Sequence, residues 1–140
     1  MKAISIICLG VRDLDTSSRF YEKIGFIKSG KSTSSITWYT TGGTVLTLYP
    51  WVSLAQDVGV SETGSGFRGV TLALNVQNRE LVNELIESVR RSGGKIVKEP
   101  APVFWGGYSS YFSDPDGHLW EVAWNPFTVV DEVGKLAVEK

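Results

Sequence analysis

The feature that most restricts the fold is an internal repeat of secondary-structure patterns. Residues 4–50 and 68–126 each show one strand pattern, one helix pattern and then three further strand patterns. Residue identity between the two halves is low, so the pattern itself is what repeats. It predicts a single domain of α+β class, built from two βαβββ modules with a linker at about 51–67 and a tail at 127–140.

The boundaries of these elements follow from caps, turn residues and periodicity. Asp13 or Asp15 is suited to cap the first helix, and Gln77 or Asn78 precedes the second. Between 51 and 67 the periodic pattern fades, and no element is expected there. In the polar tail, the one candidate element is a short terminal helix. Strands are expected at 4–11, 26–32, 36–41, 44–49, 69–76, 95–103 and on both sides of a turn at 114–117, and the helices are expected to end near residues 24 and 92.

The most specific local pattern is the final hairpin around Asp114-Pro-Asp-Gly117. Pro115 fixes φ for the first turn position, and Gly117 supplies a positive φ. On the strand that follows, Leu119, Glu121 and Ala123 share one face, while Trp120, Val122 and Trp124 share the other. Glu121 is thus a single carboxylate in an apolar strand, and burial of a carboxylate is unfavourable without a partner. That partner is a metal, a ligand or another part of the protein.

Composition excludes several classes of function. The net charge is −1, which provides no electrostatic surface for nucleic acid. No apolar run is long enough to cross a bilayer, and the first residues have the pattern of a strand and not of a signal peptide. Cys8 is the single cysteine, which is typical of a reducing cytoplasm, and we expect it to be a small core residue.

Three stretches of the chain resemble the vicinal oxygen chelate superfamily, which contains glyoxalase I, extradiol dioxygenases, fosfomycin resistance enzymes and bleomycin resistance proteins. These stretches are residues 11–26, 42–48 and 114–121, and the resemblance covers about residues 4–126. It implies two βαβββ modules whose sheets curl around a shared cavity. It also implies a homodimer as the usual assembly.

The resemblance also implies four metal-ligand positions, one on the first and one on the last strand of each module. Here they fall on Ile6, Thr47, Thr71 and Glu121, and only Glu121 keeps the family's residue type. An apolar side chain and two threonines do not supply the nitrogen and carboxylate ligands of such a site. The single histidine, His118, lies on the opposite face of the strand from Glu121. We therefore expect no cofactor, with a divalent metal as the alternative.

Aromatic residues are the other candidates for ligand binding. Tyr49 shares a strand face with Thr47 and is expected to line the cavity. Trp105 precedes Gly106-Gly107, and an aromatic on a glycine-rich loop is suited to the rim of a pocket. For Trp51, a place at the pocket rim and a structural role are equally consistent with the sequence. Tyr108 and Tyr111 alternate on one strand, so only one of them lines the cavity. The candidate ligand-binding residues are Glu121, Thr47, Thr71, Ile6, Tyr49, Trp105 and Trp51.

Three functional hypotheses follow. The first is a metal-independent, cytoplasmic, homodimeric protein that binds a small aromatic or cationic molecule, with Glu121 as the polar anchor. The second is a metal-dependent lyase, isomerase or dioxygenase of the glyoxalase type that uses Glu121. The third is an interaction protein whose cavity is vestigial. None of the three requires nucleic acid or a membrane.

Overall fold

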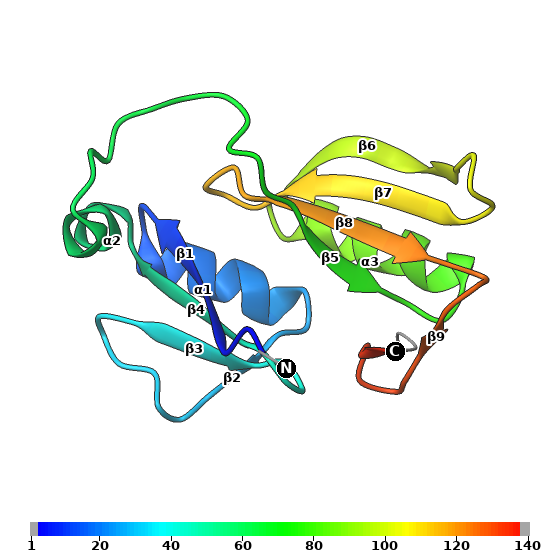
Figure 1. The fold of residues 1–140 in the computed structure, drawn as a ribbon, viewed down its shortest axis with the longest axis horizontal. Helices are drawn as coiled ribbons and strands as arrows, with labels where there is room; N and C mark the ends of the chain where they lie inside the picture. Colours follow the sequence, from blue (N-terminus) through cyan, green and yellow to red (C-terminus); the bar gives the residue numbers. More distant parts are fainter. Residues whose placement is uncertain (1–2, 138–140) are drawn as a thin grey trace. The chain divides into compact units, whose positions relative to one another are not determined.

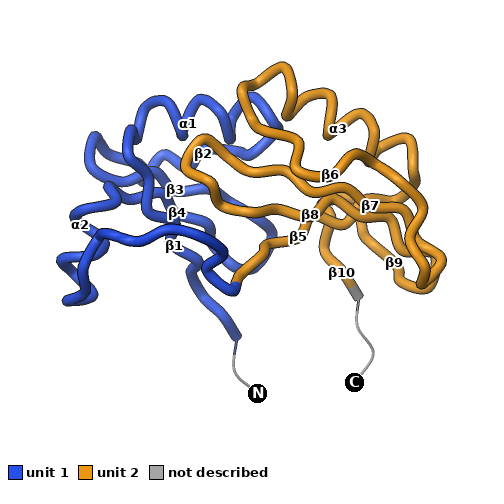
Figure 2. Tube along the Cα trace, turned by 90° about the horizontal axis from the view of Figure 1, so that it is seen from above, with its two compact units in different colours: residues 1–69 blue, residues 70–140 orange. Residues whose placement is uncertain are grey.

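The computed structural model describes residues 3–137 and confirms the α+β class and the repeated βαβββ order (Figure 1). The chain divides into two compact units, residues 1–69 and residues 70–140, which are coloured separately in Figure 2. Unit 1 contains β1 (Ile6–Val11), α1 (Leu14–Lys23), β2 (Ile27–Lys28), β3 (Thr37–Thr40), β4 (Val45–Pro50) and α2 (Trp51–Val58). Unit 2 contains β5 (Leu72–Asn75), α3 (Arg79–Arg91), β6 (Lys95–Pro102), β7 (Tyr108–Ser113), β8 (Leu119–Trp124), β9 (Val129–Val130) and β10 (Leu136–Ala137).

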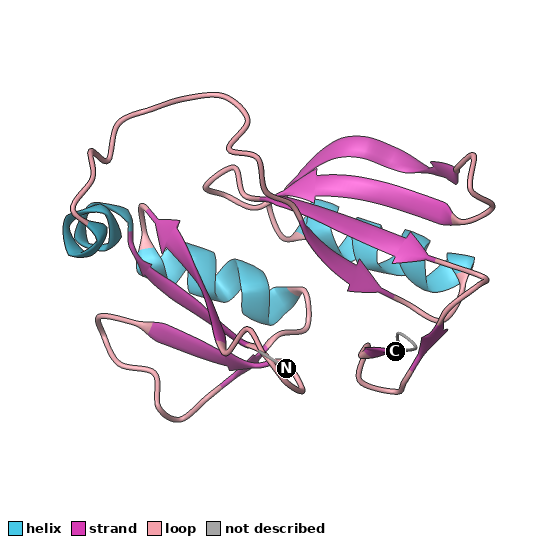
Figure 3. Cartoon of the chain, viewed as in Figure 1, coloured by secondary structure: helices cyan, strands magenta, loops and turns pink. Residues whose placement is uncertain are grey.

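The two units repeat the same sheet topology. The strand order is β1-β4-β3-β2 in unit 1 and β5-β8-β7-β6 in unit 2. In both sheets the first strand runs parallel to the last strand of the module, and the remaining pairs are antiparallel. One helix, α1 or α3, covers one face of each sheet (Figure 3). The repeat in the sequence is therefore a repeat in three dimensions within each unit.

In unit 1, the helix and the sheet are joined by a buried polar and aromatic core. Asp13 caps α1 and accepts a hydrogen bond from the backbone N–H of Thr16 at 2.7 Å. The Ser18 hydroxyl of α1 bonds to the Thr37 hydroxyl of β3 at 2.7 Å. The Tyr39 hydroxyl, on the same strand, donates to the Ser18 carbonyl at 3.1 Å. Ser18, Thr37 and Tyr39 are buried, and polar atoms buried without a hydrogen-bond partner would destabilise the fold.

In unit 2, the core is largely apolar. Asn78 caps α3 and accepts a hydrogen bond from the backbone N–H of Leu81 at 2.9 Å. Phe112 of β7 and Trp120 of β8 stack with ring centroids 6.2 Å apart and are both buried. The α3 residues that face them are Val82, Ile86 and Val89.

The final hairpin has the predicted turn. Asp114 is buried and accepts hydrogen bonds from the backbone N–H groups of Asp116 and His118, at 2.9 and 2.8 Å. Gly117 has a φ of +84°. Asp114 and Asp116 are therefore structural turn residues, as their sequence context indicated.

The helix α2 lies in the stretch for which no element was predicted. Trp51, Leu54, Ala55 and Val58 have helical spacing, but the helix has only eight residues and its N-cap, Pro50, provides no side-chain hydrogen bond. The expectation of a structureless stretch was therefore wrong for residues 51–58. A short helix without a capping side chain gives only a weak sequence signal.

The tail also differs from the expectation. Residues 129–130 and 136–137 pair as a short antiparallel hairpin, where a terminal helix was the candidate. Asp131 closes its turn by accepting hydrogen bonds from the backbone N–H groups of Val133 and Lys135. Residues 138–140 lie outside the described part of the chain. Over residues 3–137, the structure contains no helix with the length and apolar character needed to cross a membrane.

Candidate functional site

Each sheet has a second face, opposite α1 or α3, which we call the far face. In unit 1, the Tyr39 hydroxyl donates to the Ser18 carbonyl of α1, so Tyr39 and its cross-strand partner Leu46 face the helix. Side chains alternate along a strand, so Thr47, the next residue of β4, lies on the far face. In unit 2, Tyr108 pairs with Trp124 and its hydroxyl donates to Asn83 of α3 at 2.9 Å. Because side chains alternate along a strand, Glu121 lies on the far face of unit 2.

The far-face positions of the two units correspond in register. Thr47 of β4 pairs with Cys8 of β1, and Glu121 of β8 pairs with Ala73 of β5. These two pairs occupy equivalent places in the repeated sheet. The same place thus holds a threonine beside a cysteine in unit 1 and a carboxylate beside an alanine in unit 2.

The resemblance implied two further positions, Ile6 and Thr71, and each lies at the same distance along the strand from the pair just described. Ile6 lies two residues before Cys8, and Thr71 lies two residues before Ala73. Ile6 is 49% exposed, and Thr71 is exposed and directly precedes β5. The four positions are therefore equivalent in pairs between the two repeated sheets.

The side chains at these positions do not fit a metal site of the implied kind. Ile6 has no ligand atom, and the hydroxyls of Thr47 and Thr71 are poor substitutes for imidazole and carboxylate. Thr47 is also buried, with 1% of its surface exposed. In residues 3–137 there is no group of three or more His, Cys, Asp and Glu side chains that could hold a metal ion. Glu121 is the one carboxylate among the four positions.

Glu121 has a polar neighbour that the sequence did not identify. Tyr111 of β7 is its direct cross-strand neighbour, on the same face of the sheet. Burial, followed by repulsion from the nearby Glu121 carboxylate, raises the pKa of Tyr111 above its ordinary value. Tyr111 therefore remains a neutral hydrogen-bond donor at physiological pH. Both side chains are half-buried.

A row of side chains crosses the far face of unit 2 at this level. It runs from Ala73 on β5 through Glu121 and Tyr111 to Lys98 on β6, with each residue in register with the next. Lys98 is exposed, and its neighbour Glu99 is bonded to α3 on the other side of the sheet. The row thus contains a carboxylate, a phenol and an ammonium on three adjacent strands.

Tyr111 and Lys98 were absent from the predicted ligand-binding residues. The alternation of Tyr108 and Tyr111 restricted the choice to one tyrosine, but only the register of β7 against β8 selects Tyr111. The register of β6 is shifted twice, between Ile96 and Lys98 and again before Ala101, so counting residues along the sequence does not place Lys98.

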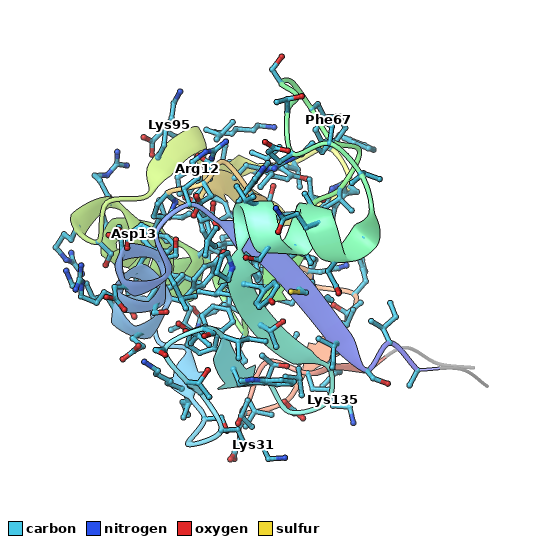
Figure 4. All side chains as sticks on the ribbon, turned by 90° about the vertical axis from the view of Figure 1, so that its left-hand side faces the viewer. Arg12, Asp13, Lys31, Phe67, Lys95 and Lys135 are labelled. Atoms are coloured by element: carbon cyan, nitrogen blue, oxygen red, sulfur yellow. The ribbon has the colours of Figure 1, made fainter. Side chains whose placement is uncertain are left out.

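Trp51 is held by contacts within unit 1. Arg12, at the end of β1 (Figure 4), and Arg68 place their guanidinium carbons 4.5 and 5.0 Å from the centre of its ring. Its indole N–H donates to the backbone carbonyl of Glu62 at 2.9 Å. A side chain on Gly10 would meet the ring at 3.3 Å, so α2 approaches β1 closely on its far face. These contacts give Trp51 a structural part in fixing the segment after α2.

Trp105 is half-buried against its own loop. Its ring lies on Gly107, and a side chain there would collide with the ring and would also lie 2.7 Å from the Trp124 carbonyl. Gly106, with a φ of +94°, is in turn close to the ring of Phe127. The ring of Trp105 thus packs on its own loop at Gly107, and its place at a pocket rim stays a prediction.

Tyr49 and Cys8 complete the far face of unit 1. Tyr49 is half-buried and pairs with Gly10 on β1, in line with its expected face. Cys8 is exposed, so its predicted place in the core was wrong. The reason is that β1 is an edge strand whose core-facing residues are Leu9 and Val11, while Cys8 points to the opposite face.

Known proteins share the fold described above. The family model described as the Glyoxalase/Bleomycin resistance protein/Dioxygenase superfamily matches residues 3–122. A crystal structure of a glyoxalase-related enzyme from Fulvimarina pelagi aligns with a TM-score of 0.88 and 33% identity, covering 100% of both chains.

Two curated relatives carry the names of enzymes. The metallothiol transferase FosB of Staphylococcus epidermidis is 26% identical over 123 residues, which are 86% of this chain and 80% of that protein. The lactoylglutathione lyase GLX1 of Arabidopsis thaliana is 38% identical over 74 residues, which are 51% of this chain and 24% of the plant protein. The match thus spans about a quarter of the plant enzyme's length.

Proposed function

The chain belongs to the Glyoxalase/Bleomycin resistance protein/Dioxygenase superfamily, and on this premise we propose that it binds a small cationic or aromatic molecule without a metal, with Glu121 as the polar anchor. The fold supplies the scaffold, and functions on this scaffold depend on the side chains of the site. Cytoplasmic location and assembly as a homodimer are part of the proposal.

The observation that carries the proposal is the environment of Glu121. The Glu121 side chain is half-buried on the far face of unit 2, where its cross-strand neighbour is the phenol of Tyr111. Within residues 3–137, Glu121 forms no salt bridge. A partly buried carboxylate with a neutral neighbour favours a cationic ligand, because a charge-assisted hydrogen bond is stronger than a neutral one.

The first test is the metal content of untagged protein purified without chelator, measured by mass spectrometry of ions. The proposal expects no stoichiometric metal and no uptake of added Ni²⁺, Mn²⁺, Zn²⁺ or Fe²⁺. A stoichiometric divalent metal would overturn the metal-independent part of the proposal.

The second test is binding of benzamidine, a flat cation, and benzamide, its neutral analogue, by calorimetry in the presence of chelator. We expect the wild-type protein to prefer benzamidine, and Glu121→Gln to weaken benzamidine binding by about tenfold or more while leaving benzamide unchanged. Equal binding of both probes by the wild-type protein would remove Glu121 as the anchor.

A second candidate function is catalysis by a lyase, isomerase or dioxygenase of the glyoxalase type, which is favoured by the name of one curated relative, a lactoylglutathione lyase. It predicts turnover of glutathione hemithioacetals or catechols that is lost in Glu121→Gln. Unchanged turnover in this variant would eliminate Glu121 as a catalytic residue.

A further inference from the structure

We propose that Lys98 binds an anionic group of the ligand, so that the far face of unit 2 binds a zwitterionic molecule with its cation at Glu121 and its anion at Lys98. The inference rests on the proposed function and narrows its ligand class. The molecules that fit are small zwitterions, such as amidino or amino acids whose two charged groups are separated by an aromatic ring.

The first argument is that an irregularity in β6 places Lys98 in the row with Glu121. Ile96 of β6 pairs with Phe112 of β7. Regular antiparallel pairing would therefore place Val97 opposite Tyr111. The register shifts after Ile96, and Lys98 is opposite Tyr111 instead. An extra residue in one strand re-aims the side chains that follow it, and here it brings an ammonium beside Tyr111 in place of an apolar side chain.

The second argument is that the contacts around Lys98 hold this arrangement. Ser110 of β7 is buried, and its hydroxyl donates to the Lys98 carbonyl at 2.6 Å. The next residue, Glu99, accepts two hydrogen bonds from the guanidinium of Arg90 on α3, at 2.9 and 3.0 Å. Because successive side chains of a strand point to opposite faces, the contact of Glu99 with α3 keeps Lys98 on the far face.

The third argument concerns charge. The carboxylate adjacent to Lys98 in the chain, Glu99, is bound to Arg90, and across residues 3–137 Lys98 forms no salt bridge. Glu121 forms none in the same range. One face of unit 2 thus presents an ammonium and a carboxylate, and each forms charge-assisted hydrogen bonds with a ligand group of opposite charge.

The fourth argument is the spacing of the two charges. Strand β7 lies between β6 and β8, so the Cα atoms of Lys98 and Glu121 are two strand spacings, or roughly 10 Å, apart. Tyr111 lies between them on the same face, and its ring provides a surface on which an aromatic ring packs. A molecule with opposite charges at the two ends of one ring fits this row.

The test compares benzamidine with 4-amidinobenzoate, which carries a carboxylate at the opposite end of the same ring, by calorimetry in the presence of chelator. We expect the wild-type protein to bind 4-amidinobenzoate about three- to tenfold more tightly than benzamidine. Lys98→Gln should lose this gain, and Lys98→Arg should retain most of it, because the guanidinium also binds carboxylates.

Lys95→Gln is the matched control. Lys95 is also exposed on β6, and it pairs with Ser113, two residues from Tyr111 on β7 and therefore on the same face. Ser113 pairs in turn with Leu119, so the row of Lys95 contains no carboxylate on β8. The variant removes the same charge from the same strand face and should retain the gain. An equal loss in both variants would assign the gain to net charge and overturn the inference.

The remaining outcomes separate the inference from the proposed function. If the wild-type protein prefers benzamidine to benzamide but gains nothing from the added carboxylate, the function stands and the inference is wrong. If Lys98→Gln removes the gain only by strengthening benzamidine binding, Lys98 pairs with Glu121 in solution, and the inference is again wrong. If the wild-type protein shows no preference for benzamidine over benzamide, the proposed anchor itself fails, and the inference fails with it.

Discussion

Thr47 in unit 1 and Glu121 in unit 2 occupy the same place in a repeated sheet, yet their surroundings differ. Thr47 is buried beside Cys8 and opposite Trp38, while Glu121 is half-buried beside Ala73 and opposite Tyr111. Trp38 and Tyr111 are themselves at equivalent positions, because each pairs with the residue in question. The repeat fixes where a side chain lies, and the residue type decides whether the place is suited to bind a charge.

The segments that follow the two modules differ as well. After β4 the chain forms α2, which approaches β1 at Gly10 on the far face. After β8 it forms the β9–β10 hairpin, where Gln77 donates to the Asp131 carbonyl at 3.1 Å. The repeated core is therefore followed by different elements in the two units, and in unit 1 the added helix α2 covers part of the far face.

The largest expected difference between the units is in the stability lost when a glycine packed against a tryptophan ring is replaced by alanine. In Gly107→Ala the new side chain collides with the Trp105 ring and with the Trp124 carbonyl, which is backbone and does not rotate away. We expect a loss of roughly 2–3 kcal/mol in the free energy of unfolding, measured by urea denaturation.

Gly10→Ala is the matched variant in unit 1. There the new side chain would meet the Trp51 ring at 3.3 Å and Leu54 at 3.4 Å, so small shifts accommodate it. We expect a change of less than about 1 kcal/mol, since the lower entropy of the unfolded alanine chain offsets part of the crowding. Equal losses in the two variants would contradict the difference between the two tryptophan sites.

A moderate difference is expected at alkaline pH. Tyr39 in unit 1 and Phe112 in unit 2 are equivalent, but only Tyr39 ionises. Burial raises the pKa of Tyr39 from 10.0 to about 12. A raised pKa in the folded state stabilises the fold fully below pH 10, and this contribution is lost as the pH rises through about 12.

The variant Tyr39→Phe makes unit 1 resemble unit 2 at this position. Near neutral pH we expect it to lose about 1 kcal/mol, because the hydrogen bond to the Ser18 carbonyl is removed. Above pH 10 the difference from the wild-type protein should shrink, as measured by urea denaturation across pH. A difference that stays constant up to about pH 12 would show that Tyr39 ionises as readily in the folded protein as in the unfolded chain.

The smallest expected difference concerns the helix caps. Asp13 caps α1 and Asn78 caps α3, so only the first cap titrates. The hydrogen bond from the Thr16 backbone lowers the pKa of Asp13 below 3.8. A lowered pKa in the folded state stabilises the fold above pH 3.8, and this contribution is lost as the pH falls through the folded pKa.

Asp13→Asn should therefore reduce the acid sensitivity of unfolding between about pH 5 and pH 3, with little change at neutral pH. Thermal unfolding at a series of pH values measures this, and Asn78→Ala provides a cap variant whose effect does not depend on pH. An acid sensitivity equal to that of the wild-type protein would exclude Asp13 as a source of it.

Much of the fold was accessible from the sequence because its signals are local. The turn at Asp114-Pro-Asp-Gly117 and the caps Asp13 and Asn78 depend on residues within a few positions of each other. The helix at residues 51–58 was missed because its stability depends on packing against β1 and not on a cap. Cys8 was placed on the same strand face as Ile6, but its expected burial was wrong, because the sequence does not show how much of that face is covered.

The sequence by itself determined the α+β fold of two βαβββ modules. It also showed that Glu121 is the one carboxylate among the four positions where the family resemblance implies metal ligands. These follow from periodicity and residue chemistry. Only the tertiary structure decided that Tyr111 is the cross-strand neighbour of Glu121 and that Arg12 and Arg68 lie against the ring of Trp51. The reason is physical: strand register and loop packing bring together residues far apart in the chain, and no local pattern encodes which of them meet.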